Sequence, residues 1–316
     1  MKKMVLISFL CGLVLPMLFI FYATWQQEKI QTPAAVEETV EQTAVREEPI
    51  GVLSPDGSVR QMEMEEYLTC VVLAEMPTDF HEEALKAQAV VARTYVGRRL
   101  VSGKHDTAAV CTDASCCQGY CSVEAFLADG GSQEAVDKVS AAVAATAGQV
   151  LTYEGELIDA TYFSCSGGST EDAVAVWGAD VPYLQAVESP GEEEAAHYSD
   201  EVRFTPGELA AALGFANDGS AEDWFGGVTY TDGGGVETME IRGNTYEGTE
   251  LRKLLGLRST VFEVEVDGDE IIITTHGFGH RVGMSQYGAQ AMAQSGSTYQ
   301  EILAHYYVGT ELENRG

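Results

Sequence analysis

Hydrophobic residues recur along the first half of the chain's central part at the three- and four-residue spacing of amphipathic helices. This pattern predicts a helix over residues 64–76, which ends at Pro77. A longer second helix is expected from residue 81 to Gly103, with Asp79 as its N-cap. Further helices are expected over residues 135–147, 206–213, 249–255, 285–294 and 298–306.

Short stretches in which apolar and polar residues alternate predict β-strands. Residues 50–53 and 59–62 flank a Ser-Pro-Asp-Gly turn and therefore predict a β-hairpin. Further strands are expected over residues 149–153, 157–160, 228–230, 237–242, 261–266 and 271–275. Because short turns join most of them, we expect an α+β fold in which helices pack on a mainly antiparallel sheet.

The N-terminal part has a different composition. Residues 4–27 contain no charged side chain, while Lys2 and Lys3 precede them. Such a run is long enough for a transmembrane helix, with the lysines on the cytoplasmic side. A cleaved signal peptide is the alternative, but residues 21–25 make a poor cleavage site. We therefore expect an anchor over residues 1–27, an acidic linker over 28–48 and a folded domain over 49–312 outside the cytoplasm.

The chain is strongly acidic. It has 49 Asp and Glu against 18 Lys and Arg, which gives a formal net charge of −31. Such a surface repels nucleic acid and anionic lipid headgroups, so we exclude binding to DNA, to RNA or to membrane surfaces. The expected partner is a neutral polymer or a polymer or protein with a basic patch.

Glu75 is the first candidate for acid–base chemistry. It stands at the end of the first predicted helix between Ala74 and Met76. A carboxyl group among apolar neighbours loses hydration and holds its proton near neutral pH, as a general acid for glycosidic bond cleavage must. By position alone, however, a solvated structural glutamate is the more frequent case.

Four sequence motifs reverse this balance. They are LAEMP at residues 73–77, ALKAQAVVARTY at 84–95, YFSCSGGSTED at 162–172 and HGFGHRVGMSQYGAQAMA at 276–293. In this order they resemble the stage II sporulation protein D family, and the resemblance extends from about Glu65 to Tyr307. It implies a membrane-anchored lytic transglycosylase that cleaves peptidoglycan glycan strands during spore engulfment, with Glu75 as the catalytic residue.

Lys86 and Arg93 lie seven residues apart and therefore on one face of the second predicted helix. A solvated basic stripe is the ordinary interpretation. The resemblance implies instead that they lie near Glu75 and hold saccharide oxygens or the lactyl carboxylate of N-acetylmuramic acid. A cation in direct contact would keep the glutamate ionised, so we expect both to face substrate.

An ordinary glycoside hydrolase needs a second carboxylate besides its acid. No motif of this chain places one, which favours an anhydro-forming reaction in which Glu75 serves both steps. Three carboxylates nevertheless remain open as partners of Glu75: Asp159, Glu171 and Asp172.

A cysteine-rich loop follows the second predicted helix. His105, Cys111 and Cys117 are separated by six residues each, which differs from the common two-residue spacing of zinc-binding cysteines. Disulfides are the alternative in an extracellular domain. The resemblance implies a zinc ion held by these three residues, structural or site-shaping because acid–base glycan cleavage needs no metal. Cys116 and Cys121 are left as a fourth ligand or as a disulfide.

Two later motifs are expected to line the substrate groove. A Gly/Ser turn follows a strand that ends near Phe163, and its glycines let backbone amides approach a ligand closely. The run after residue 275 has two histidines separated by glycines, which do not form the helix of a zinc protease. The resemblance implies that substrate contact or support of the catalytic residue comes from Ser164, Ser166, Gly167, Gly168, His276, His280, Ser285, Gln286 and Tyr287.

Two other functions remain open. A non-catalytic activator of a cell-wall amidase would need the same glycan groove and acidic surface. A thiol or metal hydrolase would use Cys165 with His276, or the zinc loop. The resemblance implies a single-pass protein of the mother-cell membrane that faces the forespore. Its implied partners are glycan strands, a cell-wall amidase and membrane proteins of the engulfment machinery.

Overall fold

The computed structural model describes residues 49–315 apart from residues 194 and 197. The predicted anchor and acidic linker, residues 1–48, therefore lie outside the described residues. Within the described ranges, no helix combines the length and the apolar character that crossing a bilayer requires. The transmembrane helix and the location of the chain stay predictions.

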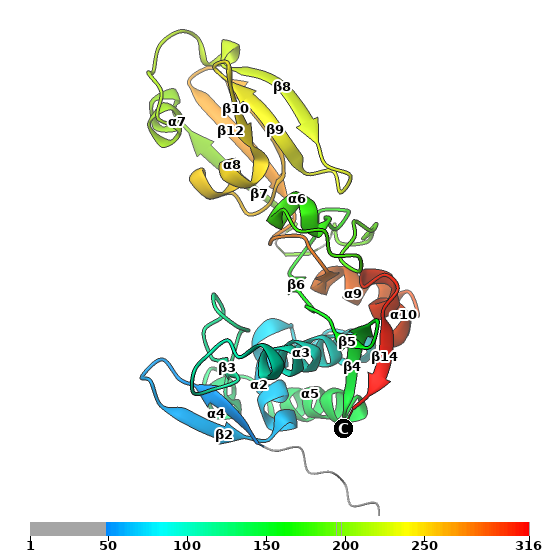
Figure 1. Ribbon diagram of the computed structural model, residues 1–316. Helices are drawn as coiled ribbons and strands as arrows, with labels where there is room; N and C mark the ends of the chain where they lie inside the picture. Colours follow the sequence, from blue (N-terminus) through cyan, green and yellow to red (C-terminus); the bar gives the residue numbers. More distant parts are fainter. Residues whose placement is uncertain (1–48, 194, 197, 316) are drawn as a thin grey trace, which may run out of the picture. The chain divides into compact units, whose positions relative to one another are not determined.

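The larger hydrophobic core surrounds α3 (Glu82–Ser102). Its residues from Ala84 to Val96 are buried on nearly every side, which is typical of a helix enclosed by other elements. The helix ends where Gly103 adopts a left-handed conformation with φ 65°. The elements packed on α3 (Figure 1) are α2 (Met64–Glu75), α5 (Gln133–Ala145), α9 (Gln286–Gln294), α10 (Tyr299–Tyr306) and β4 (Gln149–Tyr153).

Two small sheets border this core. One contains the predicted hairpin of β1 (Ile50–Leu53) and β2 (Val59–Met62), with β3 (Val110–Cys111) parallel to β1. The other has β4 in its centre, between β14 (Glu311–Asn314) and β5 (Glu156–Leu157). β4 thus pairs with a strand more than 150 residues later in the chain, and the core beside it contains residues from Ile50 to Tyr307.

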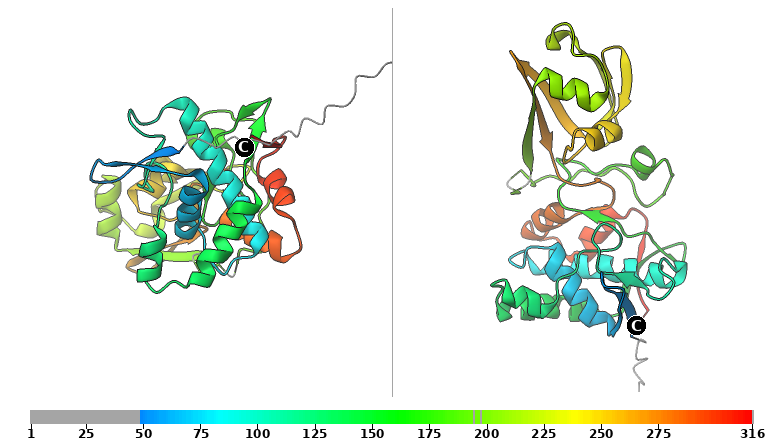
Figure 2. Two further views of the ribbon diagram at one scale, coloured as in Figure 1. Left: turned by 90° about the horizontal axis from the view of Figure 1, so that it is seen from below. Right: turned by 90° about the vertical axis from the view of Figure 1, so that its left-hand side faces the viewer.

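A second hydrophobic core is formed by residues of two antiparallel sheets. The helix α7 covers one side of this core and packs on β7 and β12; it faces the viewer in the right-hand view of Figure 2. Apolar residues alternate with exposed ones along the strands, so one face of each sheet is buried. The elements are β7 (Ser199–Phe204), α7 (Pro206–Leu213), the 3₁₀ helix Ala221–Asp223, β8 (Phe225–Tyr230), β9 (Val236–Ile241), β10 (Asn244–Glu247), α8 (Gly248–Leu254), β11 (Val261–Asp267) and β12 (Glu270–His276).

The segments before and after this second core run side by side. β6 (Tyr162–Phe163) pairs in parallel with β13 (Met284–Ser285), so that Tyr162 lies beside Met284. The remaining helices are α4 (Val123–Ala128) and α6 (Ala173–Trp177). The pairing of β6 with β13 brings two distant sequence motifs together.

The α+β class is confirmed, with small, mostly antiparallel sheets in place of the expected single one. Five strands were not predicted. β3 and β13 are only two residues long, and polar or charged residues interrupt the apolar pattern of β7, β10 and β14. The predicted N-cap of α3 was wrong. His81 caps the helix in place of Asp79, because its side chain accepts a hydrogen bond from the Glu83 N–H.

Arg93 ties three helical elements together inside the larger core. It is 2% exposed, and its guanidinium makes a two-oxygen ion pair with Glu65 of α2 at 2.8 and 3.1 Å. The same group donates to the carbonyl oxygens of Val143 and Gln149 at 3.2 and 3.3 Å. A buried cation with this many acceptors is a structural group.

We expect Arg93→Met to lower the free energy of unfolding by about 2 to 4 kcal/mol, because Glu65 and two carbonyls lose their donor. The loss stays below that of a fully buried pair, since the Glu65 side chain is 39% exposed. Lys86→Met is the matched control, with an expected change within about 1 kcal/mol for a surface pair. Urea unfolding of residues 47–316, followed by circular dichroism, measures both. Equal small losses would contradict the structural role of Arg93.

Candidate active site

Glu75 is the last residue of α2, and its side chain is half-buried. The helix ends there because Met76 takes an extended conformation before Pro77, as residues before proline generally do. Leu73 and Met76 are buried on either side of it. The sequence thus places one carboxyl group at the rim of the larger core.

Two donors bind the same oxygen of Glu75. The Gly119 N–H donates to Oε1 at 2.5 Å, and the Tyr162 hydroxyl donates to Oε1 at 3.0 Å. Among the described residues, both hydrogen bonds of Glu75 go to this atom. With Oε1 committed as an acceptor, Oε2 is the oxygen that can carry and exchange a proton.

Tyr162 is held in its neutral form. Burial first, and then the charge of Glu75, raise the pKa of Tyr162 well above its usual value. The phenol is therefore a permanent donor at neutral pH. Its oxygen also lies 3.2 Å from Oε1 of Gln118, and because a phenol has one proton it can donate to only one of these acceptors at a time.

Glu75 opens into a cleft with a volume of about 470 Å³. Its walls come from α2, α3, the cysteine-rich loop, β6 and the segment before β13. Glu75 is the only carboxylate among the described residues that line the cleft. The lining residues are Glu75, Tyr95, Ala114, Cys117, Ala160, Thr161, Tyr162, Phe163, Ser164, Phe278, Gly279, His280 and Gln286.

The cysteine-rich loop gathers four metal-binding side chains. The ligand atoms of His105, Cys111, Cys116 and Cys117 all lie within 4.8 Å of one another. Three predicted ligands thus come together, and Cys116 joins them as the fourth. Cys121 does not belong to the group. Its thiol donates to the Ser122 carbonyl oxygen at 3.6 Å, and every cysteine of the described ranges is free of disulfides.

The donor set suits a tetrahedral zinc ion, which structural sites bind with three cysteines and one histidine. His105 Nε2 lies 3.3 Å from Cys117 Sγ, so these side chains point toward one another. The residues present therefore fit such a group.

The same loop reaches Glu75. Cys117 lines the cleft, Gln118 is buried beside Tyr162, and Gly119 donates its N–H to Glu75. A Cβ atom on residue 119 would lie 2.9 Å from Oε1 of Glu75, so only glycine allows this approach. The four-residue cluster and the carboxylate are thus coupled through two intervening residues.

The Gly/Ser turn binds a carboxylate of the protein itself. Glu192, 1% exposed, accepts at Oε2 from the Ser166 N–H at 2.6 Å, the Ser166 hydroxyl at 2.9 Å and the Gly167 N–H at 3.3 Å. Gly168 donates its N–H to the Ser166 hydroxyl at 3.0 Å. Of the turn residues expected to bind substrate, only Ser164 lines the cleft. Ser166 and Gly167 donate to Glu192, and Gly168 donates to Ser166.

Cys165 also faces Glu192, with its Sγ 3.1 Å from Oε2. Burial, and then the neighbouring carboxylate, raise the pKa of the Cys165 thiol. The side chain is fully buried and cannot meet a polymer. A Cys165 nucleophile, the alternative considered from the sequence, has no support in this geometry.

The two histidines of the late motif lie in different environments. His280 lines the cleft and packs against Phe163 at 5.6 Å. Its Nδ1 accepts from the Val282 N–H at 3.2 Å. Burial, and then Arg252, lower the pKa of His280 to about 4. His276 is outside the cleft lining and packs against Tyr198 with ring centroids 5.5 Å apart, so the histidines do not form a shared metal site.

Of the three predicted site residues after the histidines, one lines the cleft and two lie outside its lining. Ser285 is the N-cap of α9, where its hydroxyl accepts from the Gly288 N–H at 3.2 Å. Tyr287 packs on Phe80 with ring centroids 5.1 Å apart. Gln286 does line the cleft, and it is only 6% exposed. Its Nε2 has no hydrogen-bond partner among the described residues, which leaves a buried donor for a ligand.

Neither predicted cation lies among the residues that line the cleft. The Lys86 ammonium pairs with Glu82 and Glu83 at 2.7 and 2.9 Å, and Arg93 is committed to Glu65. The expectation that both face substrate beside Glu75 is therefore corrected. The helical spacing does place Lys86 and Arg93 on one face of α3, but around Arg93 this face packs inside the protein.

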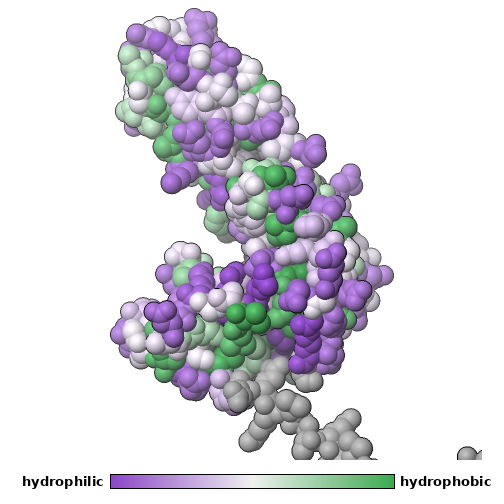
Figure 3. All heavy atoms as spheres, in the orientation of Figure 1, coloured by the Kyte–Doolittle hydropathy of each residue, from purple (hydrophilic) through white to green (hydrophobic). Residues whose placement is uncertain are grey.

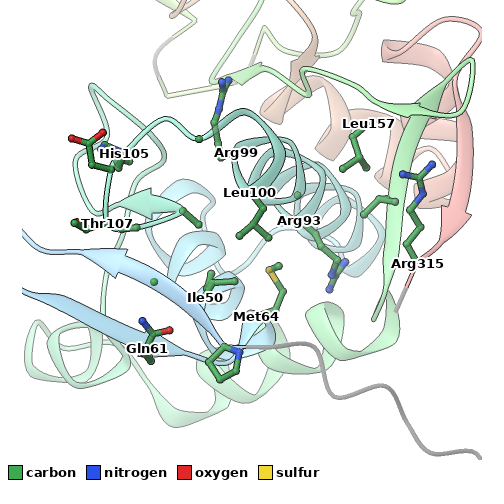
Figure 4. Close-up of a pocket in the computed structure, with 18 of the residues that line it drawn as sticks. Ile50, Gln61, Met64, Arg93, Arg99, Leu100, His105, Thr107, Leu157 and Arg315 are labelled. Carbon is green, nitrogen blue, oxygen red and sulfur yellow. The ribbon is translucent and has the colours of Figure 1, made fainter.

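Arg93 instead borders a larger cavity of about 660 Å³, which Glu75 does not line (Figure 4). Ile50, Met64 and Leu100 form its apolar side. Of the acid–base groups that line it, His105 belongs to the four metal-binding side chains and Asp106 follows it in sequence. The cavity shares no lining residue with the Glu75 cleft, and its size alone does not make it the candidate active site.

The three carboxylates left open as partners of Glu75 have other contacts. Asp159 lies 3.4 Å from Arg99, and Glu171 is buried 3.4 Å from Arg281. Asp172 accepts a hydrogen bond from the Ala186 N–H at 2.9 Å. None of them lines the cleft.

Comparison with known proteins gives a consistent result. The family described as "Stage II sporulation protein" matches residues 56–153. The chain is 38% identical to stage II sporulation protein D of Bacillus subtilis (strain 168), over 97% of this chain and 94% of that protein. It is 38% identical to the protein of the same name from Bacillus amyloliquefaciens, over 99% and 96%. It is also 29% identical to an amidase enhancer of Bacillus subtilis (strain 168), over 77% of this chain but 39% of that protein.

We expect the ring protons of His280 to titrate near pH 4 in the folded protein, because burial penalises the charged imidazolium. Between pH 4 and 6.5 the unfolded chain binds more protons than the folded one, so acidification removes stability across this window. NMR titration measures the shift, with His280→Asn to assign the signal. In concentrated urea the same signal should move to about 6.5. A folded-state midpoint near 6.5 would contradict the buried neutral ring.

Proposed function

Since this chain belongs to the stage II sporulation protein D family, we propose that it is a peptidoglycan lytic transglycosylase. The substrate bond joins N-acetylmuramic acid to N-acetylglucosamine, and the products carry 1,6-anhydro rings. One observation carries the proposal: a single half-buried carboxyl group, Glu75, opens into a cleft with two donors fixed on one of its oxygens.

In the proposed reaction, Oε2 of Glu75 donates its proton to the glycosidic oxygen while the C1–O bond breaks. The resulting carboxylate takes the proton of the muramic C6 hydroxyl, and O6 bonds to C1. The proton balance closes on the same residue, so neither water nor a second protein carboxylate is required. Throughout, Gly119 and Tyr162 keep Oε1 occupied and stabilise the carboxylate between the two transfers.

The other lining groups suit a neutral sugar. Gln286 offers an unpartnered amide donor, and His280 is neutral because its pKa is lowered to about 4. No Lys or Arg lies among the described lining residues, where its charge would favour the ionised form of Glu75. We assign Gln286 and Ser164 to substrate positioning, and Tyr162 to the support of Glu75.

We further propose that His105, Cys111, Cys116 and Cys117 hold a zinc ion. When bound, the ion supplies a structural cross-link of the loop and no chemistry at the glycan. The side chains it fixes lie two residues from Gly119, so its effect on the reaction is to hold the Gly119 N–H against Glu75.

The proposed setting follows from the family. We place the chain as a single-pass protein of the mother-cell membrane, with its folded part facing the forespore. Its proposed partners are peptidoglycan strands, a cell-wall amidase and membrane proteins of the engulfment machinery. The match to an amidase enhancer supports the rival function, a glycan-binding activator without catalysis of its own.

We expect Glu75→Gln to lower the rate of glycan cleavage by about 10³-fold, because the amide has no acidic proton to transfer to the leaving oxygen. The assay is mass spectrometry of products from peptide-free glycan strands. Wild-type protein should release anhydromuramyl ends. Glu66→Gln, on an exposed position of the same helix, is the matched control and should keep wild-type activity.

Reducing ends in place of anhydro ends would identify a hydrolase and overturn the proposed reaction. Strand binding without cleavage by either protein, together with stimulation of an added amidase, would identify the activator instead.

We expect the purified chain to bind one zinc ion. Cys116→Ser should lower the zinc affinity at least about tenfold, because it removes a ligand and even the loss of a residue that only supports a ligand costs about that much. Cys121→Ser, outside the group, is the control and should bind normally. Metal content and competition with a chromogenic chelator measure both. Cadmium should restore activity after chelation with the same anhydro products, because the ion only shapes the loop. Activity that requires zinc alone would indicate a metal hydrolase.

A further inference from the structure

Trp177 is an exposed aromatic residue beside the candidate active site. It is the last residue of α6, and 46% of it is exposed, whereas Trp224 in the second core is 2% exposed. Apolar residues also reach the surface around it, since Val174 of the same helix is 53% exposed (Figure 3). Solvent-exposed tryptophan is uncommon and is enriched where proteins bind partners or ligands.

The Trp177 ring separates two pockets. Its centroid lies 5.4 Å from that of His280, which lines the Glu75 cleft. Trp177 itself lines a second pocket of about 470 Å³. The two pockets are therefore neighbours through one pair of contacting rings, His280 on the cleft side and Trp177 on the other.

The second pocket has the composition of a carbohydrate site. An indole face offers a flat apolar surface for the C–H face of a sugar, and polar side chains around it offer partners for the hydroxyls. The lining includes carboxylates and no Lys or Arg among its described residues, so it would repel an anionic group such as the lactyl carboxylate of muramic acid. The polar lining residues are Glu171, Thr231, Glu237, Thr238, Glu247, Thr249 and Thr260.

We propose that Trp177 and this pocket form a distal subsite for a neutral N-acetylglucosamine residue of the glycan strand. The inference rests on the proposed function, since it takes the strand to be bound across Glu75. It adds that recognition extends beyond the cleft, so that affinity depends on the length of the strand.

The test uses the full chain in detergent with Glu75→Gln, so that bound strands stay intact. The probes are oligomers of N-acetylglucosamine with two and with six sugars. We expect Trp177→Ala to weaken binding of the six-sugar oligomer about tenfold, the loss of one aromatic contact, and to leave the two-sugar oligomer within about twofold. Tyr230→Ala is the matched control, because Tyr230 is 63% exposed and outside the pocket.

Thr249→Tyr tests the pocket without touching His280. Thr249 lies on α8, and a tyrosine there would fill the space. We expect the same length-dependent loss as for Trp177→Ala. Trp177→Ala could instead weaken the binding of both oligomers equally, while Thr249→Tyr has no effect. That result would mean that Trp177 only supports His280, and it would overturn the subsite.

Failure of the subsite and failure of the proposed function give different results. If the parent chain without the Glu75 change cleaves strands, and Trp177→Ala in that chain leaves the dependence on strand length unaltered, the subsite alone is wrong. If the parent chain does not cleave strands of any length, the transglycosylase itself is wrong.

Discussion

Two hydrogen bonds to one carboxylate oxygen join segments that are distant in sequence. Oε1 of Glu75, at the end of α2, accepts from Gly119 of the cysteine-rich loop and from Tyr162 of β6. Tyr162 is in place because β6 pairs with β13, and Gly119 because the loop folds around its four metal-binding side chains. The reactive geometry of Glu75 thus depends on the folding of both partners, and neither is a neighbour in sequence.

The two cations that were expected beside Glu75 make their contacts in other parts of the protein. Arg93 closes the helical core on Glu65, and Lys86 pairs on the surface of its own helix. His280, the basic side chain that does line the cleft, is neutral because burial and then Arg252 lower its pKa to about 4. A cation beside Glu75 would favour the ionised carboxylate, so this distribution suits a group that must donate a proton first.

The sequence predicted the elements whose apolar pattern is strong, including α3, the β1–β2 hairpin and the α7 helix. It did not predict the partners of Glu75, because these contacts are made only in the folded chain. Glu192 was missed since it begins an acidic run that is typical of a solvated loop. Cys116 was left open because spacing does not tell which of two adjacent sulfurs points inward. For Gly119, the glycine after the Cys-Cys-Gln run was the only available signal.

Three carboxylates of the folded region differ in how their two oxygens are partnered. Glu192 accepts from the Gly/Ser turn at one oxygen and from Ser189 at the other, at 2.5 Å. Glu171 binds Arg281 and Thr231 at Oε2, and it accepts at Oε1 from the Asp172 N–H at 3.2 Å. Both are fully partnered, so protonating either one would break contacts on which the fold depends. Glu75 differs because both of its donors bind Oε1. Its second oxygen can gain and lose a proton without a change in the surrounding structure, which is the property that acid–base catalysis requires.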